Sequence, residues 1–380
     1  MLKKILLGLV GLVVVLFLGL AVVYVATGPE MPDANSDSAR VLESGPYPVE
    51  EVDLTLVDES RPTQPNNDYP GAETRTLVTT VWYPGGDAGP QLPLIIYSHG
   101  FMSNRQGGNY LARALASHGY VVASADFPLT HFSAPGGPLV ADVNNQPGDV
   151  SFLIDSLIGL EGDAKPFSGQ VDTARIGVMG LSLGGLTSTL VAYHPRWRDD
   201  RIRAAVSIAG PGAMFTRRFY LTSDAPYLMI AGTEDAIVDY QTNAAIIPDR
   251  APQAMLLTIK GASHTGFASL AEPAMRLLNH PDSLGCGALT ANLSETTDAN
   301  PFAGLGDLTD GVDVESGGPP LCSRPLIKAL HPGRQQMITQ VGVISFFDSV
   351  FAIDTDRRQA ARLVLVETMS QDFPEASIAL

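Results

Sequence analysis

The sequence is poor in cysteine, in charge and in basic side chains. Two of its 380 residues are cysteine, 17% are charged, and 24 Lys and Arg stand against 40 Asp and Glu. Two cysteines are too few for a disulfide-dense scaffold, and a formal net charge of −16 argues against a protein that binds nucleic acid phosphates. Hydrophobic residues make up 45% of the chain, which is enough for a packed core and excludes disorder throughout.

One long apolar run lies near the start of the sequence. Ile5–Ala26 contains no charged side chain, and a helix of this length spans the hydrocarbon core of a bilayer. Lys3 and Lys4 precede the run, which predicts that the bulk of the chain is exported to the periplasmic or extracellular side. We expect residues 1–27 to form an uncleaved signal anchor. The alternative is a signal peptide, cleaved at the small residues of Gly19–Ala21, which would leave a secreted protein.

The next segment and the first strands precede the main pattern. Residues 28–48 are rich in Pro, Gly, Ser and Asp and predict a solvated tether. Residues 49–380 are expected to form the folded domain. Val49–Val57 and Arg75–Tyr83 are typical of strands, and we expect them to pair antiparallel.

Strand and helix patterns then alternate along the chain. The expected strands are short, nearly continuous apolar runs, as in strands buried on both faces; they are Leu92–Tyr97, Tyr120–Ala125, Arg175–Met179, Ala204–Ile208, Tyr227–Ala231 and Met255–Ile259. The expected helices are Gly108–His118, Val150–Leu160, Gly184–His194, Ala236–Ile246, Arg334–Phe351 and Asp356–Met369. This alternation predicts an α/β fold with a mostly parallel central sheet flanked by helices.

A G-x-S-x-G motif carries the chemistry. Gly180-Leu181-Ser182-Leu183-Gly184 lies between an expected strand and an expected helix. Small residues two positions on either side of Ser182 permit the tight, strained turn of a nucleophile elbow. An ordinary glycine-rich strand–helix turn is the alternative. A serine hydroxyl is a weak nucleophile, so a base and an acid must follow, and in this arrangement they come in the order Ser, acid, His.

The best candidate for the base is His264. It comes directly after the strand Met255–Ile259, at the edge of the sheet where α/β active sites form. His280 and His331 also follow Ser182, but they lie in or beside an irregular segment and each precedes a proline.

The acid should end the preceding strand, Tyr227–Ala231. Asp235 is our choice there, with Glu234 and Asp239 as rivals. An acid that merely stabilises a helix N-terminus is the alternative for each of the three.

The oxyanion formed during ester hydrolysis needs two backbone N–H donors. Leu183, the residue after the nucleophile, supplies one of them. The other is expected from Phe101, in the loop after the strand Leu92–Tyr97. His99 in the same loop precedes the nucleophile, and we expect it to brace the loop through hydrogen bonds.

Residues 270–332 interrupt the alternation. They are rich in Gly, Pro, Asn, Asp and Thr, and a structureless stretch of this length is unusual unless it is a functional insertion. Because it follows His264, it is a candidate lid over the substrate pocket. It contains both cysteines, and we expect Cys286 and Cys322 to form a disulfide in an exported chain, with two buried free thiols as the alternative.

We expect neither a metal nor a cofactor. Two cysteines without nearby ligands do not form a zinc site. Four acidic residues of the insertion do not have the spacing of an EF-hand, and a solvated acidic loop is the expected structure; they are Asp307, Asp310, Asp313 and Glu315.

These motifs together resemble the α/β-hydrolase fold. More closely, they are similar to bacterial hydrolases related to platelet-activating-factor acetylhydrolase and dienelactone hydrolase. The segments that carry the resemblance are Leu54–Thr63, Thr80–Pro84, Pro93–Ser103, Leu115–Pro128, Arg175–Leu186, Ile230–Asp235 and Ile259–Phe267. Two features depart from the family pattern. Many relatives have His where this chain has Leu181, and the long stretch after His264 is atypical.

The resemblance implies hydrolysis of a small-molecule or lipid carboxylic ester through an acyl-enzyme, without a cofactor. It assigns the triad to Ser182, Asp235 and His264 and the oxyanion hole to Phe101 and Leu183. A peptidase, amidase or acyltransferase on the same triad is the alternative, followed by a non-catalytic envelope binding protein. The expected partner besides substrate is the membrane, through the N-terminal helix. Neither nucleic acid nor an obligate protein partner is expected.

Overall fold

The computed structural model describes residues 19, 24–160, 166–167, 169–293 and 300–380. A nine-stranded sheet runs through these residues in the order β1-β2-β4-β3-β5-β6-β7-β8-β9. Its strands are β1 (Val49–Asp58), β2 (Arg75–Pro84), β3 (Gln91–Ser98), β4 (Val121–Asp126), β5 (Gln170–Leu181), β6 (Ile202–Ile208), β7 (Tyr227–Gly232), β8 (Ala254–Ile259) and β9 (Ala376–Ala379).

The centre of the sheet is parallel. Strands β4, β3, β5, β6, β7 and β8 pair parallel to one another, whereas β1, β2 and β9 pair antiparallel at the two sides. The mostly parallel sheet is therefore confirmed, and so is the antiparallel pair at its start. Of the described strands, only β9 has no counterpart in the sequence analysis. It has four residues, of which Ser377 and Ala379 are exposed, and so short a strand leaves little apolar pattern.

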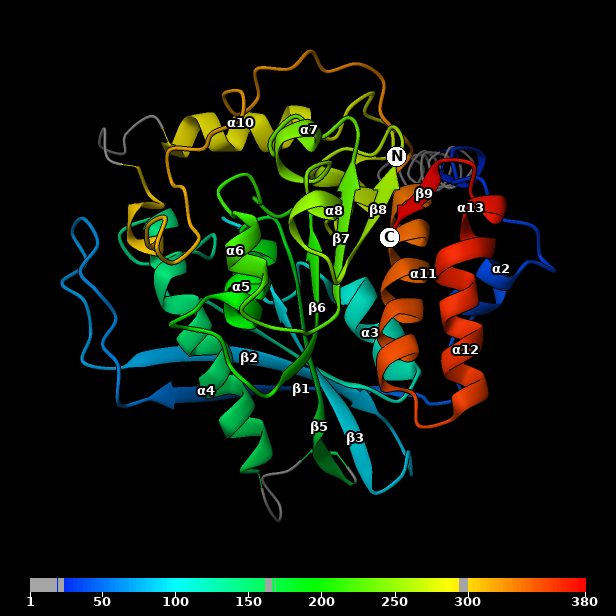
Figure 1. Cartoon of the computed structure of the whole chain (residues 1–380), viewed down its shortest axis with the longest axis horizontal. Helices are drawn as coiled ribbons and strands as arrows, with labels where there is room; N and C mark the ends of the chain where they lie inside the picture. The colour runs from blue at the N-terminus through cyan, green and yellow to red at the C-terminus, as the bar shows by residue number, and fades with distance from the viewer. Residues whose placement is uncertain (1–18, 20–23, 161–165, 168, 294–299) are drawn as a thin grey trace, which may run out of the picture.

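Helices cover both faces of the sheet (Figure 1). Successive side chains of a strand point to opposite faces. On β3, Leu94 and Ile96 belong to one apolar cluster, and Ile95 and Tyr97 belong to the other. The first cluster is covered by α4 (Gln146–Ile158), α5 (Leu183–Tyr193) and α6 (Arg217–Tyr220). The second is covered by α3 (Asn109–Ser117), α11 (Pro332–Phe351) and α13 (Met369–Asp372), and α12 (Thr355–Leu363) packs beside α11.

One expected helix is wrong. Ala236–Ile246 does not form a continuous helix, because the chain first makes a turn and then two short helices, α7 (Tyr240–Asn243) and α8 (Ile247–Arg250). The carboxylate of Asp235 accepts the N–H groups of Ile237 and Val238 at 2.8 and 2.7 Å. A side chain that binds these donors offers the backbone an alternative to a helix. The expected helix Asp356–Met369 is also modified, since a π-helical turn (Val364–Thr368) separates α12 from α13.

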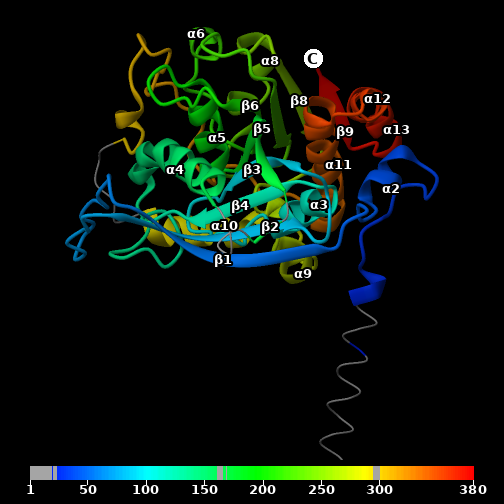
Figure 2. The same ribbon diagram turned by 90° about the horizontal axis from the view of Figure 1, so that it is seen from below.

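The segment 28–48 is more ordered than a solvated tether. It contains α2 (Asp37–Leu42), which packs beside α11 and α13 (Figure 2). The hydroxyl of Ser36 caps this helix at 3.1 Å from the N–H of Ala39, and the N–H of Ser38 donates to Asp372. The segment is therefore held on the domain by a capped helix, whose Val41 and Leu42 side chains pack against the second apolar cluster.

The expected membrane anchor falls mostly outside the described residues. Within the described ranges, no helix is both long and apolar enough to cross a bilayer. The last part of the run lies on the domain: the guanidinium of Arg276 sits 3.6 Å from the ring centroid of Tyr24 and donates to the carbonyl of Tyr24.

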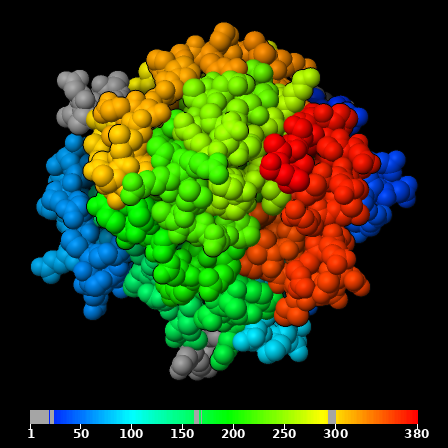
Figure 3. Space-filling model, in the orientation of Figure 1, coloured from blue at the N-terminus to red at the C-terminus, as the bar shows by residue number. Residues whose placement is uncertain are grey.

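The insertion 270–332 contains more regular structure than its sequence predicts. It forms α9 (Ala271–Met275), α10 (Asp282–Leu293) and a 3₁₀ turn (Ala303–Leu305). Cys286 and Cys322 form the expected disulfide. In Figure 1, β7 and β8 point toward the part of the molecule where α10 lies, and Figure 3 shows the yellow and orange chain of the insertion along that rim.

Candidate active site

Ser182 lies in a sharp turn between β5 and α5. Its φ of 57° and ψ of −119° place it in a region that non-glycine residues rarely adopt. Its N–H donates to the carbonyl of Ile208 at 2.8 Å, which ties the turn to the end of β6. The side chain is half-buried, so solvent reaches it. This is the strained strand–turn–helix geometry that exposes a nucleophile.

The glycines around Ser182 are sterically required. A Cβ on Gly180 would lie 2.2 Å from the carbonyl oxygen of Gly184, and a Cβ on Gly184 would lie 1.9 Å from that of Ser98. A Cβ on Gly185 would lie 2.7 Å from the hydroxyl of Ser207 on β6. The elbow therefore packs so closely against β3 and β6 that only glycine fits, as the sequence pattern predicts.

Asp235 and His264 meet at the carboxyl ends of β7 and β8. The Nδ1 of His264 lies 2.7 Å from the Oδ2 of Asp235, and both residues are buried. The other oxygen of Asp235 accepts the N–H groups of Ile237 and Val238. All three donors favour the ionised carboxylate, and they oppose the rise in the pKa of Asp235 that burial causes.

The pair controls the basicity of His264. Burial lowers the pKa of His264, but the charge and hydrogen bond of Asp235 and the charge of Asp282 outweigh that effect, so that the pKa is raised above its usual 6.5. Because Nδ1 faces a carboxylate, it carries the proton and leaves Nε2 free to accept one. Within the described part of the chain, no hydrogen bond joins His264 to the Ser182 hydroxyl. Such bonds are often long in unliganded enzymes and tighten with substrate.

The loop after β3 presses against Ser182. A Cβ on Gly100 would lie 3.4 Å from the Cβ of Ser182, so the backbone of this loop passes directly beside the serine. The N–H of Phe101, the next residue, finds no acceptor in the described ranges, and the same holds for the N–H of Leu183 at the start of α5. Two unbonded N–H groups of this kind can bind an oxyanion.

His99 braces the same loop, as expected. Its Nδ1 lies 2.8 Å from the carbonyl of Gly100, and its Nε2 accepts the N–H of Phe127 at 3.2 Å. Burial lowers the pKa of His99 to about 4, so the ring is neutral and Nδ1 is the donor to Gly100.

The rival acids and bases have other partners. Asp239 caps α7 by accepting the N–H of Thr242 at 3.0 Å, and Nη1 of Arg324 lies 3.4 Å from its carboxylate. His331 caps α11 through the N–H of Gly333.

The remaining rival base is also engaged. His280 lies with its Nε2 3.1 Å from the carbonyl of Glu234. The structure thus joins Asp235, and neither of its rivals, to His264.

In the part of the chain that the structure describes, no group of three or more His, Cys, Asp or Glu side chains is placed to hold a metal ion. In the acidic part of the insertion, Asp310 pairs with Arg196 at 2.9 Å and Asp307 binds Thr309.

One residue beside His264 was missed in the sequence. The carboxylate of Asp282, which is fully buried at the start of α10, accepts the backbone N–H of His264 at 3.0 Å. In the sequence it is an acid after Pro281 in a segment of weak periodicity, which is no different from a helix-capping residue. The hydrogen bond between Asp282 and the backbone of His264 joins two segments without a periodic pattern, so the neighbouring residues in the sequence do not predict it.

Comparisons with known proteins agree with the fold. The sequence profile of the PET hydrolase-like family matches residues 76–276, just over half of the chain. A curated relative named "Putative esterase YitV", from Bacillus subtilis (strain 168), is 30% identical over 121 residues, which cover 31% of this chain and 45% of that protein. The chain thus matches less than half the length of this relative. A ferulic acid esterase from Streptomyces cinnamoneus superposes with a TM-score of 0.53 at 19% identity, covering 84% of this chain and 97% of that one, which supports the fold alone.

Proposed function

The chain belongs to the PET hydrolase-like family of α/β-hydrolases, and from this premise we propose that it is a serine hydrolase of carboxylic esters. In this proposal Ser182 is the nucleophile, His264 the base and Asp235 the acid that orients the base. One observation carries the proposal: His264 and Asp235 form a hydrogen bond of 2.7 Å at the same edge of the sheet where Ser182 occupies its strained turn.

The proposed reaction has two steps. The Ser182 oxygen attacks the ester carbonyl while its proton passes to Nε2 of His264, and the proton then leaves with the alcohol. The resulting acyl-enzyme reacts with a water molecule that loses its proton to His264, which releases the acid and restores the serine. The N–H groups of Leu183 and Phe101 bind the negative oxygen in both steps, and the N-terminus of α5 adds a favourable dipole.

A substrate panel tests this proposal. The full chain in detergent should hydrolyse p-nitrophenyl esters in a chain-length series and a terephthalate diester, the substrate class that the family name suggests. A matched p-nitroanilide separates an esterase from an amidase or peptidase on the same triad. The proposal requires that Ser182→Ala abolish ester cleavage. Full activity of that variant, or cleavage of the anilide in preference to every ester, contradicts it.

We also propose that the domain lies outside the cytoplasm, held at the membrane by Ile5–Ala26. The disulfide between Cys286 and Cys322 supports an oxidising compartment, because cytosolic thiols are kept reduced. The test is cell fractionation, with protease added outside cells from which any outer membrane has been removed. The proposal expects the chain in the membrane fraction and its domain accessible, whereas a protease-resistant chain released only by cell lysis would contradict it.

A further inference from the structure

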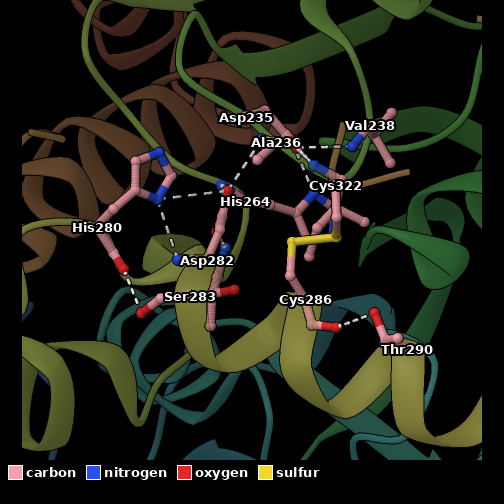
Figure 4. Close-up of a disulfide and its surroundings, with 12 residues drawn as sticks. Asp235, Ala236, Val238, His264, His280, Asp282, Ser283, Cys286, Thr290 and Cys322 are labelled. Atoms are coloured by element: carbon pink, nitrogen blue, oxygen red, sulfur yellow. Dashed lines mark hydrogen bonds and ion pairs between the residues drawn. A yellow bond between two sulfur atoms is a disulfide. The ribbon is translucent and has the colours of Figure 1, made fainter. Parts of the chain in front are cut away.

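Asp282 lies where the insertion meets two loops of the site (Figure 4). We name residues 233–239, after β7, the acid loop and residues 261–267, after β8, the base loop. The Oδ2 of Asp282 accepts the N–H of Ala236 in the acid loop and the N–H of His264 in the base loop, each at 3.0 Å. Its Oδ1 accepts the N–H of Thr265 at 2.6 Å. One carboxylate therefore binds the backbone beside Asp235 and the backbone of His264 itself.

We propose that Asp282 and the Cys286–Cys322 disulfide form a clamp that positions Asp235 against His264, with Asp282 as its positioning residue. This inference rests on the proposed function, because it assumes that the two residues are the acid and base of the triad. It assigns the insertion a part in catalysis that does not require it to open or close over the substrate.

The three donors on Asp282 require a carboxylate. All three are backbone N–H groups, and the side chain is fully buried, so water cannot replace it as their acceptor. An amide in this place would turn its NH₂ group toward at least one N–H donor. The site is therefore built for a charged acceptor, and three backbone hydrogen bonds stabilise that charge.

The disulfide holds the opposite side of the acid loop. The N–H of Cys322 donates to the carbonyl of Ala236 at 2.7 Å, so that Ala236 is bound on its N–H by Asp282 and on its carbonyl by Cys322. Cys286, one turn into α10 from Asp282, is bonded to Cys322. The disulfide thus connects α10, which carries Asp282, to Cys322, and both residues hydrogen-bond to Ala236 beside Asp235 (Figure 4).

Further contacts bring α10 against both loops. His280 Nε2 lies 3.1 Å from the carbonyl of Glu234 in the acid loop, and the N–H of Asp282 donates to Nδ1 of the same ring at 3.2 Å. A Cβ on Gly285 would lie 2.5 Å from the Thr265 hydroxyl and 3.1 Å from the side chain of Ile237. The helix therefore packs directly on the base loop and the acid loop.

Asp282 also acts on His264 through its charge. The charged and titratable groups around the imidazole are Asp235 on the acid loop, Asp282 on α10 and His280 just before α10. Arg324 donates to the carbonyl of Thr233, at the start of the acid loop. Both carboxylates raise the pKa of His264. Loss of the charge at Asp282 should therefore lower that pKa, and the acid limb of the pH–rate profile should move to lower pH.

The test compares Asp282→Asn with a matched control in the full chain. Asp354→Asn changes another aspartate at a helix start, where the carboxylate accepts the N–H of Arg357 at 2.9 Å, far from the triad. With p-nitrophenyl acetate, Asp282→Asn should lower kcat about 10- to 100-fold at little change in KM, because it misplaces groups already beside the substrate. Its acid limb should also move to lower pH. Asp354→Asn should change neither.

A second variant covers the case in which Asp282→Asn does not fold. Cys286→Ser combined with Cys322→Ser keeps the charge of Asp282 but frees the clamp, and kcat should fall several-fold without a change in KM. Unchanged kcat in folded Asp282→Asn, or in the double variant, would overturn the inference. Labelling by a fluorophosphonate separates this failure from that of the proposed function: if Ser182 reacts in the parent and not in Ser182→Ala, the triad stands and only the clamp is wrong.

Discussion

Asp235→Asn tests the triad most informatively, because the structure fixes how the new amide must lie. One oxygen of Asp235 accepts the N–H groups of Ile237 and Val238 at 2.8 and 2.7 Å, and the other lies 2.7 Å from Nδ1 of His264. The amide oxygen of asparagine must remain on the two N–H groups, since the reverse orientation would leave buried donors facing an NH₂ at about 1–3 kcal/mol each.

The amide nitrogen of the variant therefore faces Nδ1 of His264. Because the amide NH₂ is a donor, Nδ1 must become the acceptor and the ring proton moves to Nε2. With Nε2 protonated, the ring can no longer take a proton from Ser182. For a triad, the wrong tautomer costs about 10⁴ in kcat, or about 5 kcal/mol of transition-state stabilisation.

The assay is kcat for p-nitrophenyl acetate above the pKa of His264, with circular dichroism to confirm folding. Asp239→Asn is the matched control: it changes a nearby acid that caps α7, and asparagine caps a helix about as well as aspartate. The control should keep its activity. If Asp235→Asn keeps more than a tenth of kcat, or if Asp239→Asn loses as much, the assignment of the acid is wrong.

Three further predictions follow from the described contacts. The ratio kcat/KM should fall as the pH drops through the raised pKa of His264, so its midpoint lies above pH 6.5; activity that is flat to pH 5.5 would refute the role of this ring. Gly184→Ala should abolish activity, because its Cβ would lie 1.9 Å from the carbonyl oxygen of Ser98, whereas Gly317→Ala, which meets nothing within 4 Å, should be neutral in the same ester assay. Arg75→Met should lower the free energy of unfolding in urea by about 3–5 kcal/mol, because Arg75 is fully buried between two aspartates: Asp142 would lose its ion pair, and Asp149 would keep only the one with Arg61. A loss below about 1 kcal/mol would contradict this.

The sheet was predictable because its signal is local. Each central strand is a short apolar run between polar turns, and burial on both faces produces that run directly. The same is true of the elbow. The turn around Ser182 leaves no room for a Cβ at Gly180 or Gly184, so the sequence must have glycine at both positions and the motif can be recognised from it. Cys286 and Cys322 could be paired because the chain offers only one pairing.

What the sequence did not reveal depends on contacts between distant residues. Ala236–Ile246 has the composition of a helix, but the side chain of Asp235 binds the N–H groups that such a helix would use. Asp282 binds the backbone of Ala236 and His264, and a backbone N–H group carries no residue identity that could mark it as a partner. Hydrogen bonds of this kind become visible only when the loops are placed in space.

The most direct measurement of the central claim is the mass of the peptide that contains Ser182 after rapid acid quench during turnover of p-nitrophenyl acetate. A covalent acyl-enzyme predicts that this peptide gains one acetyl group on Ser182 within the first turnover, that the label disappears when substrate is exhausted, and that Ser182→Ala shows neither label nor hydrolysis. Hydrolysis by Ser182→Ala at the rate of the parent chain, or an acetyl group found only on another residue, would contradict the account.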